Sequence, residues 1–351
     1  MKLPVRYLLP GMVLASPIIS NNKQLLLGKG VILTAKIISS LKKFGILVAD
    51  VTILSKDFEA PSNEIDYGVR LNAVSLVEEL VMGGGTVNYK KILLTVDSII
   101  GEILEGKEVT SNLTNLCSVD MYTFAHCVDV CILSIAAGVL LNYDRKKLLT
   151  LGTGSLLHDI GKIKVPLMIL NKPEKLTPEE FEEMKRHSDY GYEMSKAIYD
   201  LTVLSKEIIL NHHEKYDGSG YPRGLKGEKI SDMAAICSVA DVYNAITTDR
   251  IYRKALPPHE AYEMIMAAGD LMFKNEIALT LLKLIKPYPV GSAVTLSNGL
   301  KGIVIDLKEE LIFRPVIKII ETKEIVDLKN QHNLVITGLL NNEEVQKLAL
   351  N

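Results

Sequence analysis

The chain has 351 residues, a length that at roughly 150 residues per domain predicts two or three domains. With 48% hydrophobic and 23% charged residues it can bury a substantial core, which excludes a disordered tail, a collagen-like repeat and a small disulfide-linked scaffold. Forty lysines and arginines against 42 aspartates and glutamates give a net charge of −2. Duplex nucleic acid is therefore not expected as a partner, because no overall positive field is available to hold it.

The cysteine content and the apolar runs predict the compartment. Four cysteines without a CxxC pair fit a reducing cytoplasm. The first residues are interrupted by Pro4 and Pro10 and carry Arg6, unlike the apolar stretch of a signal peptide. The longest uncharged apolar run, 130–143, is shorter than the roughly 20 residues that a membrane-spanning helix needs. We therefore expect a soluble, cytoplasmic protein without a membrane span.

Residues 1–60 predict a small α/β module. Apolar runs at 12–19 and 24–27 are separated by polar residues and predict a hairpin. Thr34 is expected to cap a helix that ends at Gly45 and precedes a strand within 46–54. The apolar face of this predicted helix consists of Ile37, Ile38, Leu41 and Phe44.

The middle of the chain predicts helices. Patterns over 64–82 and 88–106 lie in a segment of connecting helices, 61–117. Over 118–286 apolar residues recur at spacings of three and four without strand signals, which predicts one helical domain.

Residues 287–351 predict a small β-rich module. Asn298-Gly299 lies between two β-like runs, a strong hairpin signal, and 316–320 predicts a third strand. The predicted fold class is therefore mainly α: a helical bundle domain with a small α/β N-terminal module and a small β-rich C-terminal module.

The chemistry-bearing residues concentrate in the predicted helical domain. His158-Asp159 lies near the end of an apolar helix, where adjacent side chains point about 100° apart and can reach one centre or bridge two. His212-His213 repeats the arrangement, and Asp241 lies within an apolar helix, where an unpaired carboxylate is costly. A single histidine of this kind is more often a hydrogen-bonded core residue. Their joint occurrence predicts a metal site.

These residues belong to a larger motif: His126, HDIGK at 158–162, His187, HHEKYDGSGYP at 212–222, and Asp241 followed by DRIYRKA at 249–255. The series resembles the HD-GYP family, a branch of the HD metal-dependent phosphohydrolases whose members hydrolyse the bacterial messenger cyclic di-GMP. The resemblance covers about 118–286 and implies that the predicted helical domain is an HD-type bundle with catalytic function.

The resemblance also implies two divalent metal ions, usually iron and sometimes manganese. The first would be held by His126, His158, Asp159 and Asp241. The second would be held by His187, His212 and His213, with Asp159 bridging. Two ions about 3.5 to 4 Å apart can hold a bridging hydroxide and clamp a phosphodiester for in-line attack.

Further residues match family positions around the substrate. Lys162 matches a lysine that contacts the scissile phosphate. Lys162 and Asp159 are the predicted catalytic residues. Arg250 and Arg253 match positions that grip the phosphates or guanine of the ligand, and pairing with acidic neighbours such as Asp249 is the alternative.

The loop after the histidine pair has two interpretations. Tyr221 either stacks on the substrate or fixes the loop beside the pair, and Asp217 is a candidate to orient a ligand histidine. Asn244 stands where the family commonly has aspartate, so a contact near Asp241 is expected to differ in charge.

The resemblance implies a phosphodiesterase that opens cyclic di-GMP to linear pGpG, with GMP as a further product. Two alternatives stay open: a phosphohydrolase of the same superfamily that acts on another cyclic dinucleotide, and a receptor that binds cyclic di-GMP without turnover. The expected partners are cyclic di-GMP and a second copy of the chain in a homodimer.

Overall fold

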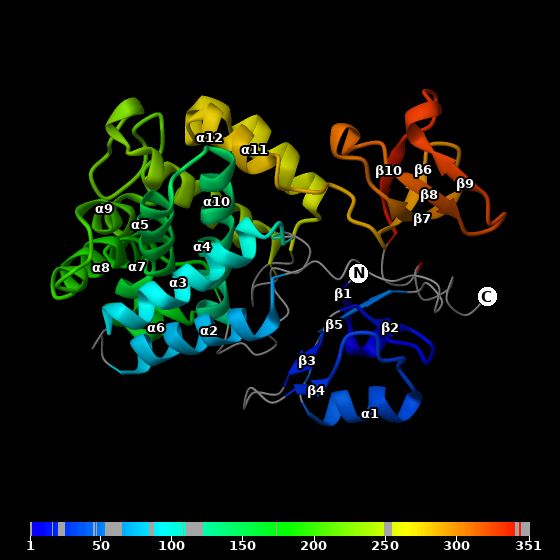
Figure 1. Cartoon of the computed structure of the whole chain (residues 1–351), viewed down its shortest axis with the longest axis horizontal. Coiled ribbons are helices and arrows are strands. Elements are labelled where there is room, and N and C mark those ends of the chain that lie inside the picture. The colour runs from blue at the N-terminus through cyan, green and yellow to red at the C-terminus, as the bar shows by residue number, and fades with distance from the viewer. Residues whose placement is uncertain are drawn as a thin grey trace.

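A computed structural model describes residues 2–15, 17–19, 25–44, 46, 48–52, 65–83, 88–107, 109, 122–172, 174–248, 255–340 and 344. Its largest part is a helical body, which lies beside two smaller modules formed by the two ends of the chain (Figure 1). The predicted fold class, mainly α with a small α/β module and a small β-rich module, is confirmed.

The N-terminal module combines short strands with one helix. Its strands are β1 (Lys2–Pro4), β2 (Val13–Leu14), β3 (Ile18–Ile19), β4 (Leu25–Leu27) and β5 (Val48–Thr52), and its helix is α1 (Ala35–Lys43). β5 lies between β1 and β2, and β3 pairs with β4 in the antiparallel hairpin that the sequence predicted. Thr34 caps α1 as predicted, because its side chain accepts a hydrogen bond from the amide of Ile37.

One part of the α1 prediction is wrong. Ile38 and Leu41 are buried, but Phe44 is 61% exposed. The helix ends at Lys43, and Phe44 is the capping residue with φ −81° and ψ 5°. Its side chain therefore leaves the apolar face that helical spacing had assigned to it.

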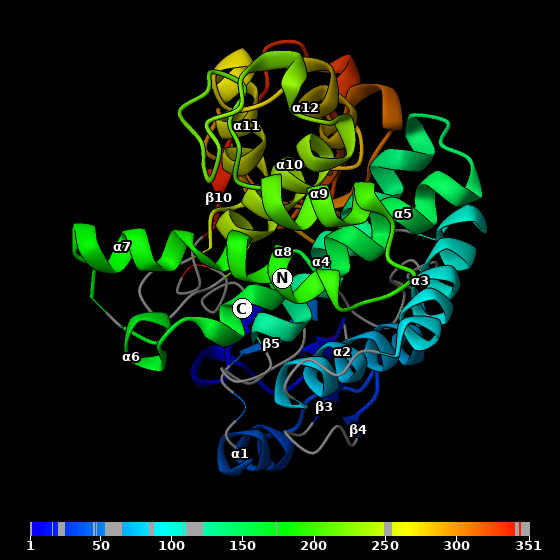
Figure 2. The same cartoon turned by 90° about the vertical axis from the view of Figure 1, so that its left-hand side faces the viewer.

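The helical body begins with two long helices, α2 and α3, where helical patterns were predicted. Its helices are α2 (Tyr67–Met82), α3 (Tyr89–Leu104), α4 (Tyr122–Leu140), α5 (Arg145–Leu156), α6 (Leu167–Leu170), α7 (Pro178–Lys185), α8 (His187–Lys196), α9 (Val203–Asn211), α10 (Asp232–Thr247), α11 (Pro258–Met272) and α12 (Asn275–Leu282). A 3-10 turn, Ile160–Lys164, follows α5. In Figure 2, α6 and α7 extend to one side of the body, just before α8.

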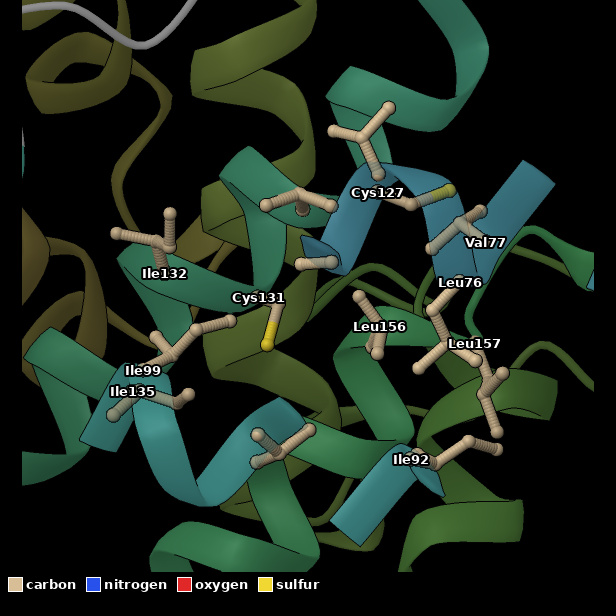
Figure 3. Close-up of a cluster of buried hydrophobic side chains, with 14 of the residues drawn as sticks. Leu76, Val77, Ile92, Ile99, Cys127, Cys131, Ile132, Ile135, Leu156 and Leu157 are labelled. Carbon is tan, nitrogen blue, oxygen red and sulfur yellow. The ribbon is translucent and has the colours of Figure 1, made fainter. Parts of the chain in front are cut away.

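A continuous apolar core joins α2 and α3 to α4 and α5 (Figure 3). Leu76 on α2 and Ile92 on α3 pack in the same buried cluster as Ile132 on α4 and Leu156 on α5. Full burial of one such aliphatic side chain stabilises the fold by about 1.5–3 kcal/mol. The helices that precede α4 are thus held directly against the α4–α5 pair.

The C-terminal module is a five-stranded antiparallel sheet in the order β10-β6-β7-β8-β9. Its strands are β6 (Ala293–Leu296), β7 (Lys301–Asp306), β8 (Val316–Ile319), β9 (Ile325–Asp327) and β10 (Ile336–Leu339). The predicted Asn298-Gly299 turn joins β6 to β7, with Gly299 at φ 83°, a value that favours glycine. Ala293 and Leu340 pack into the core of the N-terminal module, so the two ends of the chain share a core.

None of the helices in the described parts of the chain combines the length and the apolar character required to cross a membrane.

Candidate metal centre

The structure brings all seven predicted ligand residues together in the helical body. His126 lies on α4, His187 is the first residue of α8, and Asp241 lies on α10. The remaining four residues lie just beyond the ends of α5 and α9 and are His158, Asp159, His212 and His213. Their ligand atoms form overlapping groups whose members lie within 4.8 Å of one another.

The carboxylate of Asp159 lies between two sets of histidines. Its Oδ1 is 3.4 Å from Nε2 of His187 and 3.8 Å from Nε2 of His212. Its Oδ2 is 3.4 Å from Nε2 of His158 and 3.7 Å from Nε2 of His126. These spacings suit ligand atoms that share a metal ion at about 2.0–2.2 Å each. One carboxylate oxygen therefore faces each set.

Asp241 completes the first set. Its Oδ1 is 3.0 Å from Nε2 of His126 and 4.0 Å from Nε2 of His158, and its Oδ2 is 3.9 Å from Nδ1 of His213. Burial alone would raise the pKa of the Asp241 carboxyl, but the neighbouring imidazoles, of which His126 has the largest effect, hold this pKa well below its usual range. The side chain is thus an ionised ligand candidate.

Backbone carbonyls orient three of the histidines. Nδ1 of His158 donates to the carbonyl of Ser155 at 2.7 Å, and Nδ1 of His187 donates to that of Met184 at 2.7 Å. Nδ1 of His212 donates to the carbonyl three residues earlier at 2.9 Å. A carbonyl oxygen only accepts, so each Nδ1 carries a proton, and in the neutral ring the lone pair is then on Nε2. All three Nε2 atoms face the cluster, the arrangement typical of metal-binding histidines.

The chemistry of the donor set fits a divalent metal ion. Nε2 of His158 and Oδ1 of Asp159 are buried without a hydrogen-bond partner among the described residues, a costly state that a metal ion would relieve. Burial lowers the pKa of His187 and His212, and it lowers that of His213 to about 3. These three rings are therefore neutral at pH 7, the form that binds a metal.

Lys162 lies at the edge of the cluster. Its ammonium contacts Oδ2 of Asp159, and its side chain is 26% exposed. Burial alone would lower the pKa of this ammonium, but Asp159 and Asp241 outweigh that effect and raise it. A fixed positive charge therefore lies where the candidate metal centre meets solvent.

Gly161, the glycine of the HDIGK motif, sets the position of Asp159. A Cβ at Gly161 would lie 1.9 Å from the carbonyl oxygen of His187 and 2.4 Å from the amide nitrogen of Gly191. The turn that carries Asp159 thus packs against the backbone of α8, the helix that begins with His187. No other residue type fits there without moving the two segments apart.

We expect Gly161→Ala to destabilise the protein by about 1–3 kcal/mol, the usual cost of overpacking, and to lower its metal content. Thermal unfolding and elemental analysis would measure both effects. Gly101→Ala is the matched control, because Gly101 lies on α3 with nothing within 4 Å of an added Cβ. Equal melting temperatures for the two variants would contradict the close approach.

The loop after the histidine pair folds back over His213. The Tyr221 ring stacks on the His213 ring with centroids 4.7 Å apart. The buried Glu214 fixes the loop, because its carboxylate accepts hydrogen bonds from the amides of Arg223 and Leu225 at 2.7 and 2.9 Å. The Tyr221 ring is therefore held against the histidine pair.

One prediction about this region needs correction. Asp217 does not orient a histidine: it is exposed and accepts a hydrogen bond from the amide of Ser219, which holds the pKa of its carboxyl below the usual value. Asn244 lies near Asp241 as expected, because its Oδ1 is 2.6 Å from Nδ1 of His126, whose Nε2 is 3.0 Å from Oδ1 of Asp241. Arg250 and Arg253 lie outside the described residues.

The chain matches a protein family and several known proteins. The profile of the HD-domain family matches residues 120–274. A cyclic di-GMP phosphodiesterase of Pseudomonas aeruginosa is 38% identical over 224 residues, which are 64% of this chain and 54% of the relative. A cyclic di-GMP phosphodiesterase of Thermotoga maritima is 44% identical over 131 residues, 37% of this chain and 36% of the relative. The chain thus spans about half and about a third of the lengths of these relatives.

A solved structure has the same fold. An HDG"Y"P protein from Bdellovibrio bacteriovorus superposes with a TM-score of 0.50 over 81% of this chain and 98% of that one, at 19% identity. The part of the helical body over residues 120–274 therefore matches the HD-domain family and carries a set of residues suited to metal binding. The match to the HD-domain family covers residues 120–274, and the motif in this segment resembles that of the HD-GYP branch.

Proposed function

We propose that the chain is a metal-dependent phosphodiesterase that hydrolyses cyclic di-GMP to linear pGpG. The observation that carries the proposal is the position of Asp159, whose two carboxylate oxygens face two different sets of histidines. Two divalent ions, iron or manganese, fit this arrangement. When bound, such ions lower the pKa of water and polarise a phosphoryl oxygen, the chemistry that hydrolysis of a phosphodiester needs.

Each part of the site has a proposed task. The first ion is assigned to His126, His158, Asp159 and Asp241, and the second to His187, His212, His213 and Asp159. Lys162 offers its ammonium to the phosphate, where it offsets the negative charge that develops during attack. Water adds to phosphorus, one of the two diester bonds to that phosphorus breaks, and the leaving alkoxide takes up a proton. The cyclic dinucleotide thereby opens.

The Tyr221 ring and its loop limit access to the second set of histidines. The ring covers one face of His213 and stands edge-on to His187 at 6.3 Å. Burial raises the pKa of the Tyr221 hydroxyl, so this group stays neutral and offers a hydrogen bond rather than a charge. Its task is to hold His213 in place at the side where the nucleotide enters.

Product analysis tests the proposal. The purified chain, loaded with manganese or anaerobically with iron, is incubated with cyclic di-GMP, and the nucleotides are separated by chromatography. The proposal predicts linear pGpG, with GMP accumulating later if the chain also cleaves the linear product. Protein stripped of metal by a chelator is the control. Binding of cyclic di-GMP to the metal-loaded chain without a linear product would instead identify a receptor.

The substrate preference is tested at two arginines. Arg250 and Arg253 are proposed to grip the phosphates or guanine of the ligand. The double alanine variant should lose about ten- to hundredfold in the turnover of cyclic di-GMP, the scale of one or two lost charge-assisted hydrogen bonds. Hydrolysis of bis(p-nitrophenyl) phosphate, which has neither guanine bases nor a second phosphate, should change little. Equal losses on both substrates would assign the arginines to the fold instead.

A control variant accompanies this test. Arg145 lies at the start of α5 and pairs with Asp97 in an exposed salt bridge. Arg145→Ala removes an arginine without touching the proposed site, so both substrates should be hydrolysed at the wild-type rate.

A further inference from the structure

A chain of polar contacts runs from α2 to the metal centre. Oδ1 of Asn244 lies 2.6 Å from Nδ1 of His126, and Nδ2 of Asn244 donates to Oδ2 of Asp129 at 3.4 Å. The other oxygen of Asp129 accepts a hydrogen bond from the guanidinium of Arg70. Asp129 and Asn244 are fully buried, and the Arg70 side chain is 15% exposed.

Helix geometry explains why these groups meet. His126 and Asp129 are three residues apart on α4, and Asp241 and Asn244 are three residues apart on α10. Residues at this spacing share one face of a helix, and α4 and α10 pack against each other. The ligand candidates His126 and Asp241 face each other across the two helices. Asp129 and Asn244 lie one turn further along and support them.

The contacts fix the direction of every hydrogen bond. A carboxylate paired with a guanidinium only accepts, so the amide nitrogen of Asn244 must face Asp129. The amide oxygen then faces His126 and requires the proton of that ring on Nδ1. In the neutral ring, the form that binds a metal, Nε2 of His126 then has its lone pair toward Asp159 and Asp241. The orientation of a ligand candidate is thus determined at Arg70, three contacts away.

We propose that Arg70 is a positioning residue for the metal centre and that it acts through Asp129 and Asn244 on His126. The inference rests on the proposed function, because it assigns Arg70 a task in holding the first metal ion. Arg70 lies on α2, ahead of the segment that matches the HD-domain family. The helix that precedes this domain therefore contributes to the first metal position.

The same contacts explain the amide at position 244. An aspartate there would place a second carboxylate against that of Asp129, at the position where Nδ2 now donates at 3.4 Å. Two facing carboxylates repel each other, and neither can donate to the other. Asn244 is thus matched to Asp129, and exchanging the two residue types should restore an acceptable pair.

Metal titration of single and paired variants tests the proposal. Arg70→Met and Asn244→Asp should each weaken Mn²⁺ binding at the first position by about 10- to 100-fold, the usual effect of losing a partner behind a metal ligand. The weakened binding step should be the one that His126→Ala abolishes. Mn²⁺ binding at the second position should be unchanged. Isothermal titration calorimetry resolves the two steps. Arg145→Met, which breaks an exposed ion pair, is the control.

Two rescues separate positioning from general stability. Arg70→Lys should recover part of the affinity, because an ammonium still pairs with Asp129. The exchange Asp129→Asn/Asn244→Asp should bind Mn²⁺ more tightly than Asn244→Asp alone. In the exchange, the amide at position 129 can donate to the carboxylate at position 244, which still accepts from His126. Should Arg70→Met fail to fold, as judged by circular dichroism, the Asn244→Asp variant and the exchange test the same contacts.

The outcomes are distinct. If Arg70→Met, or Asn244→Asp where Arg70→Met does not fold, leaves both Mn²⁺ steps unchanged, or if the exchange binds no better than Asn244→Asp, the positioning role is overturned while the proposed function stands. If the wild-type chain binds no metal ion at all, the proposed function fails and this inference fails with it.

Discussion

Replacing Asp159 with alanine should remove both metal ions from the protein. Its two oxygens face two separate sets of histidines, so the single change takes one ligand from each. It also takes away the negative charge that offsets two divalent cations in a buried site. The metal content, measured by elemental analysis of protein purified without added metal, should fall from about two ions per chain to well below one.

His187→Ala is the matched variant for this experiment. His187 faces Oδ1 of Asp159, on the side of the second set. Its loss should therefore empty the second position and leave about one ion per chain. Full metal content in Asp159→Ala would contradict the bridging assignment, and loss of both ions in His187→Ala would contradict the division into two sets.

The second large effect is expected at Lys162. Its ammonium contacts Asp159 and reaches the solvent-exposed edge of the site, where a phosphate would meet the metal ions. Lys162→Ala should reduce turnover of cyclic di-GMP by about 10²- to 10³-fold, the scale of losing one group that stabilises charge in the transition state. Metal content should be retained, because Lys162 is not a ligand. Steady-state kinetics and elemental analysis on the same preparation measure both quantities.

Lys164 provides the control for this variant. It lies in the same short turn, Ile160–Lys164, and its side chain is exposed. Lys164→Ala removes an identical charge two residues away and should keep the wild-type rate. Turnover by Lys162→Ala within a few-fold of wild type would show that the ammonium has no part in the reaction.

Five of the seven ligand candidates were predictable because they are marked locally, whereas His126 and His187 were assigned through the family resemblance. The local marks are a His-Asp pair, a His-His pair and an aspartate within an apolar helix. Glu214, which fixes the loop, was missed although it directly follows the pair, and its burial was its only distinguishing feature. The supporting contact between Arg70 and Asp129 joins residues 59 apart in the chain. Such a pair is defined by how the helices pack, which periodicity does not specify.

The fold also has features that the local sequence marks and features that depend on contacts between distant segments. Long helices such as α3 were predicted because buried residues recur at a regular spacing over several turns, as at Ile92, Val96 and Ile99. Strands β1 and β9 have three residues each and β10 has four, too few for an alternating pattern to stand out. They form because neighbouring strands supply hydrogen bonds, which local sequence does not reveal.

Anomalous X-ray scattering from crystals of the manganese- or iron-loaded chain tests the central claim most directly. A binuclear site predicts two peaks about 3.5–4 Å apart, with the carboxylate of Asp159 between them. His126, His158 and Asp241 should surround one peak, and His187, His212 and His213 the other. A single peak, or two peaks that do not share Asp159, would contradict the binuclear site on which the proposed hydrolysis depends.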